Sequence, residues 1–401
     1  MNQGPCFPFL CRSALLPGES LASLLVRLAA LNAYASPYMV ERVIQERLTQ
    51  SDDPVQPMLA ETYQVLQQLT TLPSGALYQA TAHPWARMMN GLDENRPLVL
   101  LPDGITRPLL PTEAQKQLLW SSHHICYCPY CLRATAYHRM VWQPRAAAVC
   151  LEHDCLLVQG CQVCHTALSM QAVVQRHCLQ CHFDLTQAVT SSVVQDDFGL
   201  FAQTTLWRWL EQDTNCPGDP LTTASQFELW SKWACSMPQE PPAVLYQVVA
   251  GLQRALYPVE PEWFYWHPTN SHFSDRNRGS DGRWQRLTPT SLAPELAYSL
   301  YATAFKALVN WPDGFYEFLD AYQRRHGCQV TSSVAQVFGV LYSHCLEKLW
   351  LSPHFHFVQV AFNRYLAQNY PLRPAMLHSR RYQHNPQLAP KFPHLTAEEA
   401  A

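Results

Sequence analysis

Charged side chains are scarce in this 401-residue sequence: Asp, Glu, Lys and Arg make up only 15% of it, and the net charge is −3. Proteins that hold nucleic acid mainly by electrostatics normally carry an excess of basic residues, so this balance argues against such binding. Apolar runs of the roughly 20 residues needed to span a bilayer are also lacking. We therefore expect no contact with the membrane interior.

Several other signatures are missing. The first 17 residues have neither the basic start nor the apolar core of a secretory leader, and the 15 cysteines are an odd number. Both facts predict a reducing, cytoplasmic location. The absence of a Gly-x-x-x-x-Gly-Lys-Ser/Thr loop excludes a P-loop ATPase, and the carboxylates form no recognisable nuclease constellation. We expect a protein that is not an enzyme.

Paired Cys and His residues, in contrast, are abundant between residues 126 and 181. Four pairs follow one another, each with two residues between its members, and this spacing lets one tight turn present both ligands to a tetrahedral ion. The loops that join the pairs, 18 and 13 residues, are in or near the range for zinc ribbons and fingers. Taken in order, the pairs predict two structural Zn²⁺ sites: Cys128, Cys131, Cys150 and His153, then Cys161, Cys164, Cys178 and Cys181.

Neighbouring residues of the same types leave the ligand assignment open. Each of five could replace a chosen ligand: Cys126, Cys155, His165, His177 and His182. Disulfides are an alternative that the missing leader disfavours. A catalytic zinc keeps a coordination position open for water, whereas both quartets are filled by protein. The zinc deaminase signature also fails, because Tyr127 rather than proline precedes Cys128.

The N-terminal part reads as short helices with tight turns, in a helix-turn-helix-like arrangement. Ser20 is a plausible N-cap, and a leucine stripe follows at helical spacing: Leu21, Leu24, Leu25, Leu28 and Leu31. Further helices are expected over 38–48, 58–69 and from 76. Residues 1–100 contain six Arg, no Lys and eight acids, so we expect these helices to bind protein rather than DNA.

The C-terminal half also reads as helices, over 225–234, 243–256, from 312 and over 332–349. Residues 352–397 contain no acid, so this basic segment could touch guide RNA, DNA phosphates or an acidic partner; the alternative is a disordered basic tail. An arginine-rich loop at 275–286 is interpreted as a solvated linker. The sequence thus predicts a mainly α protein in three parts: a helix-turn-helix-like domain with connector (1–117), a double zinc-knuckle or ribbon module with short β-hairpins (118–192), and a helical C-terminal domain (193–401).

Two blocks of sequence resemble the TniQ family of transposon target-selection adaptors. The first comprises Pro17, residues 19–21, Ser23, residues 27–29 and Asn32. The second leads from His124 through Cys128-Pro-x-Cys131-Leu, Tyr137 and Trp142 to the later Cys and His pairs. In this order they cover about the first 190 residues, and the short segment Asn310-Trp311-Pro312-x-x-Phe315 adds modest support for the CRISPR-linked members.

The resemblance implies a non-catalytic adaptor of a CRISPR-associated transposon. In such systems the Cascade complex and its guide RNA supply sequence recognition, and TniQ connects them to the AAA+ ATPase TnsC. The modest length and slightly acidic charge favour this role, and a homodimer is plausible by the same resemblance. The alternative is a TnsD-like protein that binds a fixed DNA site itself.

Overall fold

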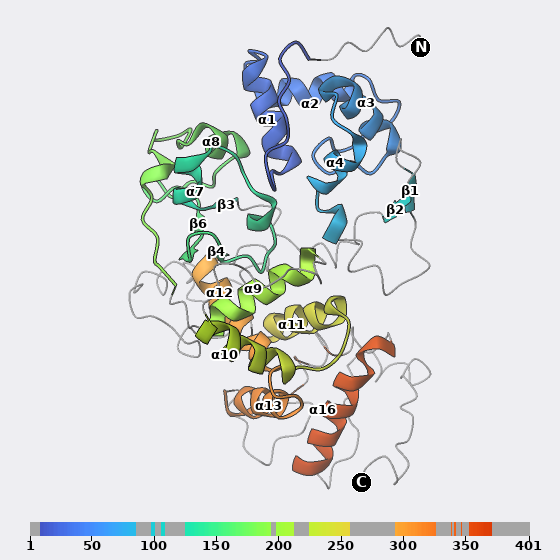
Figure 1. The fold of residues 1–401 in the computed structure, drawn as a ribbon, viewed down its shortest axis with the longest axis vertical. Helices are drawn as coiled ribbons and strands as arrows, with labels where there is room; N and C mark the ends of the chain where they lie inside the picture. Colours follow the sequence, from blue (N-terminus) through green and yellow to red (C-terminus); the bar gives the residue numbers. More distant parts are fainter. Residues whose placement is uncertain are drawn as a thin grey trace, which may run out of the picture. The chain divides into compact units, whose positions relative to one another are not determined.

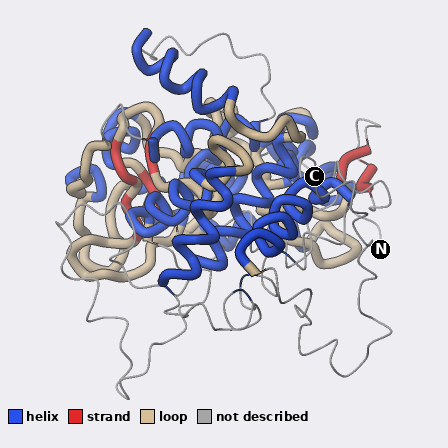
Figure 2. The backbone as a smooth tube through the Cα atoms, turned by 90° about the horizontal axis from the view of Figure 1, so that it is seen from below, coloured by secondary structure: helices blue, strands red, loops and turns tan. Residues whose placement is uncertain are grey.

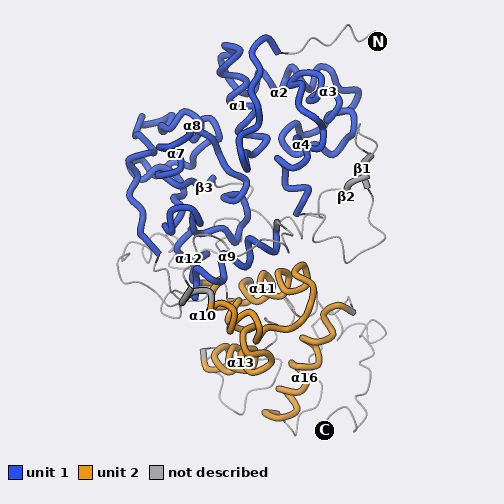
Figure 3. The backbone as a smooth tube through the Cα atoms, viewed as in Figure 1, with its two compact units in different colours: residues 1–219, 271–299 blue, residues 220–270, 300–401 orange. Residues whose placement is uncertain are grey.

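The computed structural model describes residues 9–85, 98–100, 106–108, 125–193, 198–211, 224–256, 293–325 and 353–370, with 338, 341 and 346. Over these residues the fold is mainly helical and the strands are two or three residues long (Figures 1 and 2), which confirms the predicted fold class. Two compact units are distinguished, residues 1–219 with 271–299 and residues 220–270 with 300–401 (Figure 3). The predicted three-part division stays a prediction. None of the described helices is long and apolar enough to cross a membrane.

Four short helices begin the first unit: α1 (Leu21–Leu31), α2 (Pro37–Gln45), α3 (Ala60–Thr70) and α4 (Ser74–Gln79). Ser20 caps α1, as predicted, by accepting a hydrogen bond from the Ser23 amide. The leucine stripe packs into a common core with residues of α2, α3 and α4. Leu31 is the exception, because half of its surface is exposed at the end of the helix.

The cysteine-rich segment follows as a small module of short elements. Its strands form two antiparallel pairs, β3 (Cys126–Tyr127) with β6 (Val158–Gln159) and β4 (Val149–Cys150) with β5 (Cys155–Leu156), which confirms the expected short β-pairings. The helical pieces are α7 (Pro129–Ala134), η1 (Met140–Trp142), α8 (Met170–Gln175) and η2 (Leu185–Gln187). Apart from this module, β1 (Leu98–Leu100) pairs with β2 (Thr106–Pro108) within the expected connector. The helix α9 (Phe198–Glu211) follows the module.

The regular elements in the described part of the second unit are all helices. The unit boundary crosses α12, and only the C-terminal half of this helix belongs to the second unit. The helices are α10 (Ala224–Cys235), α11 (Pro242–Leu256), α12 (Pro294–Lys306), α13 (Asp313–Arg325), η5 (Pro353–Phe355) and α16 (His356–Asn369). An aromatic cluster forms part of the core, where the ring of Phe338 contacts those of Tyr322 and Phe362. Phe338, Leu341 and Leu346, three residues of the stripe expected over 332–349, are fully buried.

Three helices of this half differ from the sequence expectations: α12, α13 and α16. Helix α13 begins at Asp313, so Pro312 precedes the helix instead of occupying its first position. The helices α12 and α16 were not individually anticipated. Helix α16 lies in the acid-free segment and buries Val358, Phe362 and Tyr365, because an apolar stripe runs between its polar residues. The arginine-rich loop at 275–286 and the basic residues from 373 onward lie outside the described residues.

A buried carboxylate fixes the start of α1. Glu19 is 1% exposed, accepts hydrogen bonds from the Leu16 amide and the Ser23 hydroxyl, and forms an ion pair with Arg27. Arg27 also donates to the Ser13 hydroxyl. The Arg27 guanidinium is therefore engaged within its own domain.

We predict that Glu19→Ala lowers the free energy of unfolding by about 2–4 kcal/mol, because it leaves a mostly buried guanidinium and the buried Ser23 hydroxyl without their acceptor. Glu46 provides the matched control. It pairs with Arg42 at the i,i+4 spacing of α2, with both side chains more than half exposed, so Glu46→Ala should cost less than about 0.5 kcal/mol. Chemical denaturation of both variants measures the difference, and equal losses would contradict it.

Candidate metal centres and the adjoining helix joint

The structure brings the eight predicted ligands together as two clusters of four. In each cluster the candidate ligand atoms all lie within 4.8 Å of one another. The first cluster contains Cys128, Cys131, Cys150 and His153, and the second contains Cys161, Cys164, Cys178 and Cys181. Both groupings are the ones that the order of the pairs suggests, so each cluster could hold a metal ion.

The distances between the ligand atoms fit tetrahedral coordination. Four sulfur atoms at 2.3 Å from one ion are separated by about 3.8 Å, and a sulfur–nitrogen edge is about 3.6 Å. In the first cluster the Sγ atoms of Cys131 and Cys150 are 3.6 Å apart, and His153 Nδ1 lies 3.3 Å, 3.5 Å and 3.7 Å from the Sγ atoms of Cys131, Cys150 and Cys128. A disulfide would require a separation near 2.05 Å.

The second cluster has the same spacing. The Cys161 and Cys181 Sγ atoms are 3.5 Å apart, and those of Cys164 and Cys178 are 3.6 Å apart. The Thr166 side chain lies 3.4 Å from Cys164 Sγ, and hydrogen bonding by Thr166 lowers the pKa of the Cys164 thiol to about 6. A thiol with a lowered pKa reaches the thiolate form that binds metal more easily.

Two of the residues that the sequence left as alternative ligands have a conformational role. His165 and His182 each follow directly after a Cys-x-x-Cys pair, with φ of 59° and 60°. Their amides donate to the carbonyls of Cys161 and Cys178, which closes each ligand turn. Histidine is among the residues that adopt this left-handed conformation more readily than most. The third alternative, His177, has Nδ1 2.8 Å from the Gln175 carbonyl oxygen.

The remaining alternatives are two buried cysteines. Cys126 lies in β3, and burial raises the pKa of its thiol to about 12, so it stays protonated. Cys155 lies in β5 with its Sγ 3.8 Å from Cys128 Sγ, beside the first cluster. The structure therefore leaves Cys155, but not the others, at a ligand-like distance from a cluster member.

A hydrogen-bonded joint connects α1 to the same module. The Ser20 amide donates to the His138 carbonyl, and the Met140 amide donates to the Gly18 carbonyl. The His138 amide donates to the Ser23 hydroxyl, and His138 Nδ1 lies 3.2 Å from the Ser20 hydroxyl. Residues of both resemblance blocks thus meet here, including Tyr137, whose hydroxyl donates to the Pro17 carbonyl.

The buried imidazole of His138 in this joint is neutral near pH 7. Ser20 Oγ accepts from the Ser23 amide and lies within hydrogen-bond distance of His138 Nδ1. The backbone of Cys126 is a further hydrogen-bond partner of the imidazole. Burial lowers the pKa of His138 to about 4.

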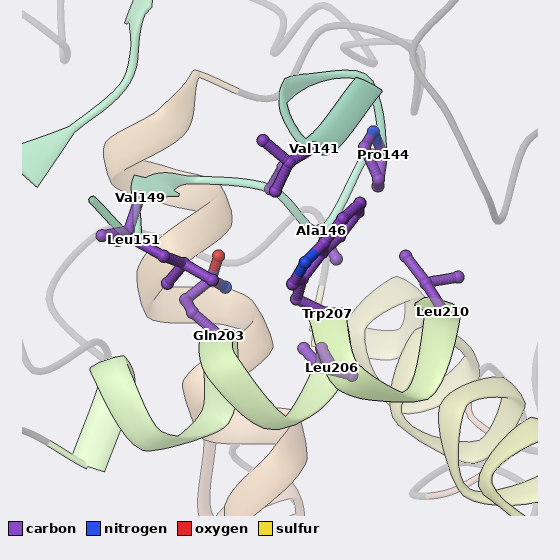
Figure 4. A pocket seen from close by; sticks show the side chains of 10 residues that line it. Val141, Pro144, Ala146, Val149, Leu151, Gln203, Leu206, Trp207 and Leu210 are labelled. Carbon is purple, nitrogen blue, oxygen red and sulfur yellow. The ribbon is translucent and has the colours of Figure 1, made fainter. Parts of the chain in front are cut away.

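Two hollows lie beside the module. The smaller, about 20 Å³, is lined by apolar residues of the module and by Gln203, Leu206, Trp207 and Leu210 of α9 (Figure 4). It has room for about one water molecule, and Gln203 Oε1 accepts from the Ala148 amide at its edge. The larger is an open cleft of about 680 Å³ lined by residues of both the N-terminal helices and the module, among them Trp85, Arg139, Trp142 and Trp207.

Comparison with known families identifies one domain of the chain. Residues 10–157 match the family model named TniQ. The chain carries a TniQ domain over these residues. No curated protein matches the chain. The TniQ match contains the whole joint and the first cluster, and it ends before Cys161, the first residue of the second cluster. A TniQ domain indicates an adaptor that selects targets for transposition.

The buried histidines predict a pH dependence. Burial lowers the pKa of both His83 and His138 to about 4 from the usual 6.5. Between these values the unfolded chain binds protons that the folded chain does not, so stability should fall as the pH drops from about 6.5 to about 4, by at most about 1.4 kcal/mol per pH unit for each histidine.

The test uses His83, which lies among the N-terminal helices away from the cysteines. Its ring stacks on Tyr78 at a centroid distance of 5.4 Å, so His83→Phe keeps an aromatic ring while removing the titrating group. Denaturation curves at pH 7, 6 and 5 should show a shallower loss of stability for this variant than for the unchanged protein. Metal content is measured at each pH, and parallel slopes at constant metal content would refute the prediction.

A second prediction concerns the clusters. Cys128→Ser or Cys161→Ser removes one ligand, so each should lower the melting temperature and the solubility and reduce the bound metal by one ion per chain. Cys235→Ser, at an exposed cysteine of α10 outside both clusters, is the matched control and should change neither quantity. Normal stability with a selective loss of biological activity would instead indicate a catalytic metal.

Proposed function

We propose that this protein is a non-catalytic target-selection adaptor of a CRISPR-associated transposon. It would connect the Cascade complex and its guide RNA to the ATPase TnsC, and so direct RNA-guided DNA transposition. The observation that carries the proposal is the TniQ domain at residues 10–157. A homodimer and contact with DNA or RNA through the basic C-terminal segment belong to the same proposal.

A structural role for the metal supports an adaptor. We propose that each cluster binds one Zn²⁺, because thiolate and imidazole ligands at tetrahedral spacing suit this ion. Four protein ligands would fill each coordination sphere, which leaves no position for a water or a substrate. The ion then stabilises the module in place of a large apolar core. Zinc analysis of freshly purified protein should give about two ions per chain.

The arginines of the N-terminal helices give further support. Arg27 pairs with Glu19, Arg42 pairs with Glu46, and Arg47 donates to the Val43 carbonyl. A guanidinium group that is already bonded to an acceptor in its own domain is less available to a phosphate. This favours protein partners over a DNA duplex for these helices.

The alternative function is a TnsD-like target selector that binds a fixed attachment site on DNA. One observation favours it: Arg364 is exposed on α16, in a segment without acids. The two functions differ in what carries the sequence information, since the adaptor relies on guide RNA and the selector on its own surface.

A pull-down and a gel shift separate the two functions. Tagged protein should retain Cascade and TnsC at physiological salt, and Cys235→Ser should retain both equally well. In a gel shift against random duplex and candidate attachment sites, the protein alone should show weak binding without sequence preference. Tight, sequence-selective binding without Cascade would overturn the adaptor function, as would failure to retain either partner.

A further inference from the structure

A fifth donor lies beside the four residues of the first cluster. Cys155 is 1% exposed, and its Sγ lies 3.8 Å from Cys128 Sγ, the length expected for one edge of a tetrahedral zinc–thiolate site. Cys155 is not one of the four residues whose ligand atoms all lie within 4.8 Å of one another, but with them it brings the number of nearby donors to five. A tetrahedral ion binds four ligands, so two of these five residues compete for one coordination position.

The β4–β5 hairpin explains why Cys155 faces the cluster. Cys150 and Cys155 are directly opposite each other in the antiparallel register, and opposed residues project their side chains to the same side of the sheet. The Cys150 side chain belongs to the cluster, so the Cys155 side chain is directed there too. Strand β5 is held in place by its neighbours, because the Leu156 amide donates to the Ser191 carbonyl and Cys155 forms an isolated antiparallel β-bridge with Ser192.

His153 is attached differently. It lies in the turn between β4 and β5, next to Asp154 with φ of 42°, and its amide donates to the Cys150 carbonyl over 3.3 Å. It is the exposed member of the first cluster, whereas its three cysteines are buried. An exposed side chain on a hairpin turn can rotate away from the ion without disturbing the ladder that positions Cys155.

We propose that Cys155 is an alternative fourth ligand of the first metal centre and replaces His153 when the imidazole withdraws. The inference rests on the proposed metal binding. The exchange breaks the metal–nitrogen bond and forms a metal–sulfur bond, while the thiol proton passes to the released imidazole or to water. No electron is transferred. Cys128, Cys131 and Cys150 remain ligands in both states, and the net charge of the centre falls by one.

This exchange predicts how the metal content of the full-length protein responds to substitution. His153→Ala and Cys155→Ser should each retain two ions per chain after dialysis against a competing chelator, since one fourth ligand remains. The double variant His153→Ala/Cys155→Ser should retain only one, in the second cluster. Cys150→Ser, which removes a shared ligand, is the control that loses the first site whichever residue completes it.

Cobalt spectroscopy identifies the ligand that completes the site. With Co²⁺ in place of the native ion, His153→Ala should show stronger sulfur-to-metal charge transfer than the unchanged protein, because a fourth thiolate replaces nitrogen. The spectrum of Cys155→Ser should match that of the unchanged protein. The second cluster serves as an internal standard and reports whether each variant is folded.

The possible failures are distinguishable. If the unchanged protein holds fewer than two ions, the proposed metal binding fails. If it holds two but His153→Ala holds one, Cys155 is not a ligand and the exchange is refuted. The exchange is equally refuted if the double variant keeps both ions, or if Co²⁺ in His153→Ala shows the absorption of three thiolates only.

Discussion

The contact between the start of α1 and the segment around His138 is the constraint on which the rest of the TniQ domain depends. It consists of backbone hydrogen bonds in both directions and of a buried serine–histidine pair. Burial favours the neutral imidazole here, because a charged one would lose its hydration in this site. The helices and the cysteine-rich module are thereby fixed to each other over more than 100 residues of sequence.

The two clusters complement this joint. Seven of the 17 buried residues of the module core are cysteines, and they pack beside aliphatic and aromatic residues such as Leu157, Val173 and Trp142. So small a core contributes little stability by burial alone. An ion bound by four residues from distant turns crosslinks those turns, and so it stabilises the module where packing cannot.

Much of this arrangement was accessible from the sequence. Ligand pairs have fixed spacing, so the eight residues that cluster could be named beforehand. The leucine stripe and its Ser20 cap defined the start of α1 to the residue, because both signals are local. The joint could not be predicted, since nothing in the local pattern links Ser20 with His138. The ion pair of Arg27 and the position of Cys155 likewise depend on contacts between distant residues.

Helix α16 was missed for a different reason. The conspicuous feature of its segment is the absence of acids, whereas the helical spacing of Val358, Phe362 and Tyr365 is interrupted by polar residues and is less obvious. The turns at His165 and His182 were read as possible ligands, because identity alone does not reveal a positive φ.

The joint also determines how this domain can be exchanged between proteins. The signature around residues 17–27 is completed by residues 137–140, which lie across the connector and beyond the first ligand turn. Grafting the four N-terminal helices of another TniQ protein onto this chain would place a foreign serine cap against the resident histidine. Recombination between relatives should therefore preserve the two stretches as a pair, and they should vary together from one member of the family to the next.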